Sequence, residues 1–231
     1  MAKGTTIILL KLEGVLQSWG DHSKWDYRDS ADFPSKSGVA GLLACAMGME
    51  RGDPAMAELA SSLRIAVRAD RPGVRMVDFH TVKGEPRLMT ANGTPRGEDK
   101  STIVSRRWYL QDASFLVAVD AGALWTPRIC QGLRDPKWPV FLGRKSCVPS
   151  RPVLERVTEE YTSVLDAIFR YPAVSENGER RSPAGLRYEC EEEWGDSRLY
   201  TRADQLLSGE RDFALRTVYS GIVPEEETPC T

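Results

Sequence analysis

Hydrophobic residues follow two different spacings along this chain, and each spacing predicts a different kind of element. Residues 5–12 are β-branched and aliphatic and lie between Gly4 and Gly14, which predicts a buried first strand. Residues 39–47 are apolar nearly all round, which is typical of a buried helix. The polar segment 13–33 between them is too long for a tight turn.

The start and the end of the helix over 39–47 carry their own signals. Ser35 or Ser37 can cap its free N–H groups, and Gly48 suits a left-handed stop. Gly38 and Gly41 predict that a second backbone comes close to this helix.

Later patterns extend this series of elements. Residues 63–68 alternate between apolar and basic and predict a half-exposed strand. Further strands are expected over 113–120 and 140–142, and further helices over 53–61 and 124–133. This order predicts an α+β fold of the ferredoxin-like type.

Two regions lie outside that series. Residues 77–110 contain several glycines and prolines and predict a long excursion, a β-hairpin or mobile arm, of a kind that is usually functional. From 151 to 231 the runs are short and strand-like, and the tail is acidic. We therefore expect a main domain over 1–150 and a smaller strand-rich module over 151–231.

Composition narrows the class of protein. The 231 residues are 41% hydrophobic and 28% charged with a net charge of −2, so any nucleic-acid surface must be local. Five scattered cysteines without a C-x-x-C pair, and only two histidines, favour reduced thiols over disulfides or zinc. With no targeting or membrane-spanning segment and no cofactor motif, we expect a cytoplasmic protein without cofactor.

Lys36 and Ser37 mark a candidate anion site. They stand at the start of the predicted buried helix, where unpaired N–H groups and an ammonium favour phosphate. The alternative is an ordinary core helix that begins with Ser and Lys.

A basic glycine loop is the second candidate site. Gly143 is followed by Arg144, Lys145 and Ser146, and five basic residues against one acidic over 134–151 give a local charge of +4. A guanidinium fork, an ammonium and a hydroxyl beside glycine suit a phosphodiester backbone. The alternative is a solvated basic turn.

The third candidate interleaves cations and rings in Arg106, Arg107, Trp108 and Tyr109. Bases of single-stranded RNA stack on such rings while arginine holds the phosphates. The alternative is a half-buried strand edge whose arginines extend to solvent.

His80 is a candidate general acid or base for RNA cleavage, although no second histidine or carboxylate is tied to it by spacing, so a structural role is the alternative. The acidic cluster over 189–193 suits a solvated face better than a metal site. We therefore assign no catalytic and no metal-binding residues.

Five segments resemble the CasD family of the type I-E CRISPR surveillance complex (Cascade), within the RAMP superfamily. They occur in the family's order over residues 1–150: Leu16-Gln17-Ser18-Trp19-Gly20, Phe33-Pro34-Ser35-Lys36-Ser37-Gly38, Asp78-Phe79-His80-Thr81-Val82, Tyr109-Leu110-Gln111-Asp112-Ala113-Ser114-Phe115 and Phe141-Leu142-Gly143-Arg144-Lys145-Ser146-Cys147.

The resemblance implies a ferredoxin-like (RRM-type) domain whose excursion is a protruding thumb. It implies a noncatalytic subunit that binds the 5′ handle of the CRISPR RNA (crRNA) and caps the backbone filament. The partners would be the backbone subunit, the large subunit and, through the complex, target DNA. The matching positions are Lys36, Ser37, His80, Arg107, Tyr109, Arg144, Lys145 and Ser146, whereas Arg106 and Trp108 depart from the family pattern.

Two other functions remain open at the level of sequence. One is a metal-independent endoribonuclease that processes precursor crRNA, as related type I-C subunits do, with His80 beside a lysine or tyrosine. The other is an α+β interaction module without an RNA role.

Overall fold

The computed structural model describes residues 5–24, 26–84, 88–90, 92–95, 97, 102–175, 178–208 and 212–225. The helices are α1 (Lys36–Met47), α2 (Ala55–Ser62), α3 (Gly122–Arg134) and α4 (Val164–Arg170). The strands are β1 (Ile7–Glu13), β2 (Leu16–Gln17), β3 (Tyr27–Arg28), β4 (Arg64–Arg71), β5 (Val74–Lys83), β6 (Thr102–Gln111), β7 (Ser114–Asp120), β8 (Leu154–Thr158), β9 (Ala173–Val174), β10 (Arg180–Arg181), β11 (Arg187–Cys190), β12 (Arg198–Leu206) and β13 (Phe213–Ile222).

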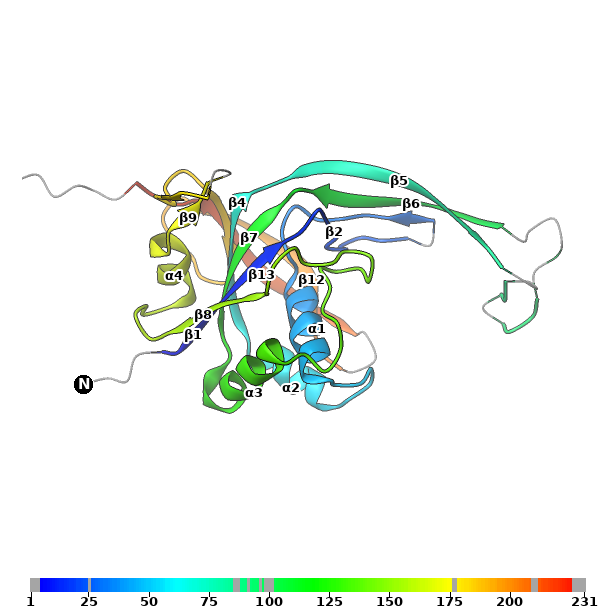
Figure 1. The fold of residues 1–231 in the computed structure, drawn as a ribbon, viewed down its shortest axis with the longest axis horizontal. Coiled ribbons are helices and arrows are strands. Elements are labelled where there is room, and N and C mark those ends of the chain that lie inside the picture. Colours follow the sequence, from blue (N-terminus) through cyan, green and yellow to red (C-terminus); the bar gives the residue numbers. More distant parts are fainter. Residues whose placement is uncertain are drawn as a thin grey trace, which may run out of the picture.

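A seven-stranded antiparallel sheet forms the centre of the molecule, in the order β12-β13-β11-β4-β7-β1-β8. The helices α1, α2 and α3 lie on one side of it and α4 lies on the other (Figure 1). Both faces of the middle strands are therefore covered. The first strand, expected over 5–12, is confirmed as β1, and it is buried because Ile8 and Leu10 face one core while Ile7 and Leu9 face the other.

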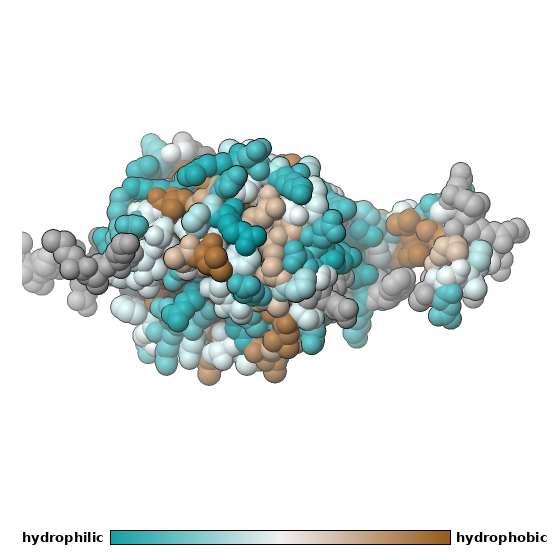
Figure 2. Space-filling model, turned by 90° about the horizontal axis from the view of Figure 1, so that it is seen from below, coloured by the Kyte–Doolittle hydropathy of each residue, from teal (hydrophilic) through white to brown (hydrophobic). Residues whose placement is uncertain are grey.

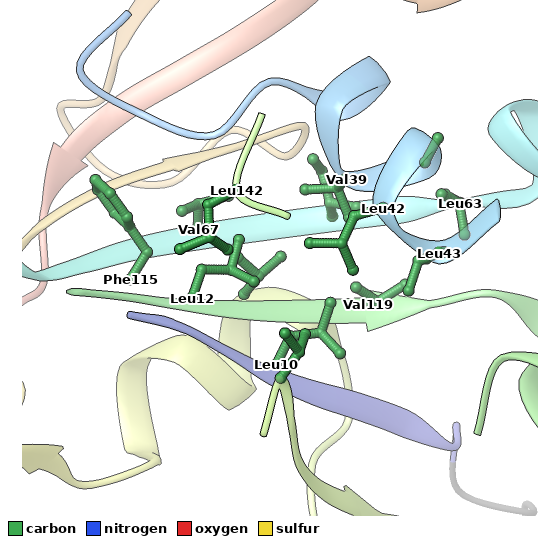
Figure 3. Close-up of a cluster of buried hydrophobic side chains, with 14 of the residues drawn as sticks. Leu10, Leu12, Val39, Leu42, Leu43, Leu63, Val67, Phe115, Val119 and Leu142 are labelled. Carbon is green, nitrogen blue, oxygen red and sulfur yellow. The ribbon is translucent and has the colours of Figure 1, made fainter. Parts of the chain in front are cut away.

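The helix α1 confirms the expectation for 39–47 and supplies much of the larger core. The Ser35 side chain accepts a hydrogen bond from the Gly38 N–H, and Gly48 ends the helix with a φ of 72°. Val39, Leu42 and Leu43 project toward the sheet (Figure 3). Each such buried aliphatic side chain contributes about 1.5–3 kcal/mol to stability.

The glycines of α1 do not receive another backbone, so that expectation is wrong. A Cβ atom on Gly38 would meet the Trp19 ring at 3.0 Å, and one on Gly41 would meet nothing within 4 Å. The close approach involves Gly132 of α3 instead, where a Cβ atom would lie 3.1 Å from the backbone nitrogen of Met47.

Two strand expectations also differ from the structure. The strand expected to be half-exposed over 63–68 is β4, which is buried because β11 and β7 flank it and helices cover it. Its Arg68 is fully enclosed, where it pairs with Asp70 and donates to the carbonyl oxygens of Ile168 and Tyr171 at the end of α4. Residues 140–142 form an irregular loop rather than a strand.

The excursion expected over 77–110 corresponds to the β5–β6 hairpin, which we call the thumb. Its strands pair antiparallel from Val74 opposite Gln111 to Lys83 opposite Thr102. The thumb projects from the compact part of the molecule (Figure 1). In the space-filling view a group of hydrophobic residues lies on the thumb, apart from the compact part (Figure 2). Residues 85–87, 91, 96 and 98–101 lie outside the described residues.

Residues 151–225 contribute to the same central sheet. The strand β8 pairs with β1, while β11, β12 and β13 extend the sheet beyond β4. The expected boundary at 151 therefore does not separate two sheets. In the described part of the chain, no helix has the length and apolarity to span a membrane.

Candidate nucleic-acid interface

The thumb divides the candidate residues between its two faces. Side chains alternate along a strand, and β6 pairs with β5 so that Arg106 lies opposite Phe79 and Arg107 lies opposite Asp78. Arg107 and Tyr109 therefore share one face, which we call the inner face, because Tyr109 is buried against the core. Arg106 and Trp108 share the opposite, outer face.

The glycine loop packs closely against the segment that follows β2. Gly143 has a φ of 87°, and a Cβ atom there would lie 1.7 Å from the carbonyl oxygen of Ser18. The Ser18 N–H donates to the Leu142 carbonyl at 3.1 Å, and the Cys147 N–H donates to the Arg144 carbonyl at 2.8 Å. Only glycine permits this approach, which fixes where the next three side chains begin.

Arg144 joins the glycine loop to the thumb. Its guanidinium carbon lies 4.7 Å from the centre of the Tyr109 ring. Its Nη1 donates to the Trp108 carbonyl at 3.1 Å, and its Nη2 donates to the carbonyl oxygens of Arg28 and Asp29 at 3.0 and 3.2 Å. Arg144 is therefore engaged with the protein itself, whereas Lys145 and Ser146 are exposed.

The short strand β3 is a part of this region that sequence reasoning missed. It runs parallel to β6, with Tyr27 beside Arg106 and Arg28 beside Arg107. The Tyr27 and Trp108 ring centres are 6.2 Å apart. A two-residue strand has no periodic pattern, and its partner lies about eighty positions later in the sequence, so no local signal marks it.

Asp29 holds the segment that carries β3. Its carboxylate accepts hydrogen bonds from the N–H groups of Asp21 and His22 at 3.1 and 2.6 Å and from the Ser23 hydroxyl at 2.8 Å. Partial burial acts to raise the pKa of Asp29, but these hydrogen bonds outweigh it, and the pKa is lowered. The carboxylate is therefore charged at neutral pH and keeps this loop folded.

Lys36 lies at the start of α1, as expected, but other groups of the protein surround it. Its backbone N–H donates to an oxygen of Asp204 at 2.8 Å, and its ammonium lies 2.9 Å from a Glu191 oxygen. The residue is 5% exposed. Ser37 lies next to it, with its hydroxyl 3.4 Å from that of Ser35. The chain's own carboxylates thus occupy the positive end of this helix.

Two members of the acidic cluster over 189–193, Glu189 and Glu191, belong to that same arrangement, whereas Glu193 is exposed as expected. Glu189 accepts from Arg202 at 3.0 Å, and Arg216 lies 3.4 Å from Glu191. In the part of the chain that the structure describes, no three Asp, Glu, His or Cys side chains are grouped as metal ligands.

His80 lies on the inner face, farther along the thumb than Tyr109. Its Nε2 is 2.6 Å from an Asp78 oxygen, and Ser105 stands opposite it on β6. Four strand positions separate Ser105 from Tyr109, which is about 13 Å along an extended strand. The structure thus brings together Arg107, Tyr109, Arg144 and Arg28, and leaves His80 and Lys36 at separate places.

Comparison with known proteins assigns the family. A protein-family model described as "CRISPR-associated protein (Cas_Cas5)" matches residues 7–219. The chain therefore belongs to the Cas5 family of CRISPR-associated proteins, and the resemblance seen in five sequence segments is confirmed.

Individual relatives are consistent with this assignment. The chain is 30% identical to the CRISPR system Cascade subunit CasD of Escherichia coli (strain K12), over 92% of this chain and 94% of that protein. It is similar to a chain in a structure titled "CRISPR RNA-guided surveillance complex", with a TM-score of 0.77 and 34% identity over 94% of this chain and 90% of the other. A second structure, titled "Crystal structure of Cas protein", gives a TM-score of 0.72 and 32% identity over 95% and 96% of the two chains.

Proposed function

We propose that this protein is a noncatalytic subunit of a CRISPR RNA-guided surveillance complex, in which it binds the 5′ handle of the crRNA and caps the backbone filament. The observation that carries the proposal is the convergence at Arg144. One side chain joins the glycine loop, the end of β3 and the base of the thumb, where Arg28 and Arg107 are paired on adjacent strands. Lys145 and Ser146 follow Arg144 in the loop and are exposed. Cations with a hydroxyl suit the phosphates of a short single strand.

The core topology supports this role. Within the sheet, β4-β7-β1-β8 is the strand order of a ferredoxin-like domain of the RRM type, with α1 and α2 between β1 and β4 and α3 between β7 and β8. The thumb is then an insertion between the second and third strands of that domain. In this chain α4 covers the sheet face opposite α1, α2 and α3, so the proposed site lies on the thumb and the glycine loop rather than on the central sheet.

We infer that the partners are the backbone subunit and the large subunit of such a complex, with target DNA reached through the assembly. The named relatives, a Cascade subunit and a chain of a surveillance complex, support partners of this kind. We place the complex in the cytoplasm.

Metal-independent RNA cleavage is the second candidate function, because His80 is paired with Asp78 at 2.6 Å. A cleaving site also needs a lysine or tyrosine within hydrogen-bond reach of the same 2′-hydroxyl. Ser105 stands opposite His80, whereas Tyr109 is four positions farther along β6. This spacing favours the noncatalytic role. Cleavage of repeat RNA in EDTA, abolished by His80→Ala, would establish the enzyme instead.

Ultraviolet crosslinking of the assembled complex tests the binding role. The chain is co-expressed with the other subunits and a guide, and the crosslinked peptides and nucleotides are identified by mass spectrometry. We expect crosslinks from 105–109 and 143–147 to the 5′ end of the guide. An assembled complex whose guide crosslinks only to other parts of this chain would contradict the site, and one without any guide RNA would contradict the function.

A further inference from the structure

The segment 16–20 carries part of the family resemblance, but none of its side chains has a role in the proposed handle site. Gln17, Ser18 and Trp19 are at most 2% exposed, so a ligand cannot reach them directly. Each of the three nevertheless makes polar contacts with a different part of the surrounding structure. The segment therefore acts, if it acts at all, through the residues that it holds in place.

Gln17 attaches this segment to the central sheet. Its Nε2 donates hydrogen bonds to the carbonyl oxygens of Leu12 at 3.0 Å and Ala113 at 2.8 Å, and its Oε1 accepts one from the Trp19 Nε1 at 3.1 Å. These bonds use both N–H groups and the oxygen of the buried amide. Because Leu12 belongs to β1 and Ala113 directly precedes β7, the segment is fixed to two central strands.

Ser18 connects that fixed point to the glycine loop and to the base of the thumb. Its backbone N–H donates to the Leu142 carbonyl at 3.1 Å, and its hydroxyl donates to the Trp108 carbonyl at 3.1 Å. The same Trp108 oxygen also accepts from the Arg144 Nη1 at 3.1 Å. A carbonyl oxygen has two lone pairs, so Ser18 and Arg144 together satisfy this one.

Trp19 connects the segment to the residues that follow β3. Its backbone N–H donates to the Ser30 hydroxyl at 3.0 Å, and its carbonyl oxygen accepts from the Ala31 N–H at 2.6 Å. The segment 16–20 therefore contacts the glycine loop, the base of the thumb and the segment after β3, which are the three parts that Arg144 also joins.

We propose that Ser18 is a positioning residue for the handle site. Its backbone holds the glycine loop and its hydroxyl holds β6, so it sets where Lys145 stands relative to the thumb without touching RNA. The inference rests on the proposed function, because it names a residue that shapes that same site. The alternative is that Ser18 only stabilises the fold, in which case every folded molecule of a Ser18 variant binds as the wild type does.

A double-mutant cycle with Lys145 tests this role. The full chain is titrated into a fluorescently labelled RNA of about ten nucleotides with the sequence of the 5′ end of the guide, and binding is measured by anisotropy. We expect Ser18→Ala to weaken binding about three- to tenfold, the usual effect of losing one hydrogen bond. In a Lys145→Ala background the same substitution should weaken binding less than about twofold, because the cation that Ser18 positions is gone.

Ser163→Ala is the matched control. The Ser163 hydroxyl accepts from the Asp166 N–H at 3.1 Å at the start of α4, on the other side of the sheet. This variant also loses one serine hydrogen bond, so its stability in urea should fall about as much as that of Ser18→Ala. Its binding to RNA should stay unchanged.

Gln17→Met removes the attachment of the segment to the sheet and should weaken binding more than Ser18→Ala does. All variants are measured under conditions in which circular dichroism shows them folded. If Gln17→Met does not fold, Ser18→Ala still decides the matter, because it leaves all three Gln17 hydrogen bonds in place.

The possible outcomes separate the inference from the proposed function. A loss from Ser18→Ala that largely disappears in the Lys145→Ala background supports the positioning role. If Ser18→Ala binds RNA as Ser163→Ala does while Lys145→Ala binds weakly, the positioning role is wrong and the handle site stands. Losses that simply multiply in the double variant also overturn it, because Ser18 then does not act through Lys145. If neither Lys145→Ala nor Ser18→Ala changes binding, the proposed site and the inference fail together.

Discussion

Arg144 has a side chain suited to phosphate, but in this structure it holds two segments of the protein together. In the sequence it is one of several cations in a basic loop, and a phosphate contact is the natural expectation. In the structure both of its terminal nitrogens donate to backbone carbonyl oxygens, and its plane covers the Tyr109 ring. Arg144 therefore positions the loop, and the exposed Lys145 is the cation available to a ligand.

Salt dependence separates these two roles. Lys145→Ala should weaken binding of handle RNA and lower the slope of log K against log salt by about 0.7, the value for one phosphate on a single strand. Arg144→Ala should weaken binding as well, because the loop loses its attachment, but should change the slope less. The measurement is a salt titration of the full chain with handle RNA. An Arg144→Ala slope that falls as far as that of Lys145→Ala would show a direct phosphate contact.

Gly143 allows a sharper test at one atom. A Cβ atom there would overlap the Ser18 carbonyl oxygen, so Gly143→Ala should force the loop away from the segment after β2 and cost about 3 kcal/mol or more. Gly122 is a matched control, because it also has a positive φ, 66°, but its Cβ position is open. Gly122→Ala should cost only about 1–2 kcal/mol, the penalty of the left-handed backbone. Urea unfolding of both variants measures the difference, and equal losses would disprove the close approach.

At the scale of elements, local signals in the sequence predict the bounds of α1, but they do not predict the burial and pairing of the strands around it. Ser35 and Gly48 identify both ends of α1 because capping acts within a few residues. The burial of β4 depends on β11, which lies more than a hundred positions later. The segment 106–109 looked like a single site, although strand periodicity alone already separates Arg106 and Trp108 from Arg107 and Tyr109. The parallel pairing of β3 with β6 has no local signal in the sequence.

The attachment of α1 to the C-terminal strands predicts an acid-sensitive contact. Burial acts to raise the pKa of Asp204, but hydrogen bonds and charge from Arg216, with the Lys36 N–H, outweigh it and lower the pKa. A carboxyl whose folded-state pKa is lowered stabilises the fold above its unfolded pKa, near 4. That contribution is lost as the pH falls through the folded-state pKa. Burial raises the pKa of the nearby Glu189, so the contribution of Glu189 to stability changes with pH in the opposite direction.

Asp204→Asn isolates this contribution. The variant should lose about 2–4 kcal/mol at pH 7, because the buried charge of Arg216 then has only Glu191, 3.4 Å away, to balance it. Below pH 4 the difference from the wild type should begin to shrink, because the unfolded wild-type chain then binds a proton at this carboxyl, and it should be lost as the pH falls through the folded-state pKa. Asp196→Asn, at an exposed turn before β12, is the control and should change stability by less than about 0.5 kcal/mol. A loss from Asp204→Asn that stays constant from pH 7 to pH 3 would contradict the ionic account.

For the whole molecule, the central question is whether residues 151–231 form a separate module, as the change in sequence pattern indicates. Composition can show where a pattern changes, but it cannot show which strand edge a later segment covers. Here β8 pairs with β1, and β11 covers the edge of β4. The carboxylates that surround Lys36 also come from this later part of the chain, from Glu191 and Asp204. A chain cut at 150 would expose two strand edges and leave a buried ammonium without a partner.

We therefore expect the full chain to unfold as one unit and residues 1–150 to have no stable fold alone. Urea unfolding followed by far-UV circular dichroism and by tryptophan fluorescence should give coincident transitions for the full chain. Trp125 on α3 is a useful reporter because it is buried and lies far along the sequence from β12 and β13. Its fluorescence therefore reports on the first 150 residues. Residues 1–150 should aggregate or bind a hydrophobic dye, because both edges of their sheet are open. A cooperative transition in that fragment would instead establish two independent modules, with the β11–β13 extension as an accessory to a self-sufficient core.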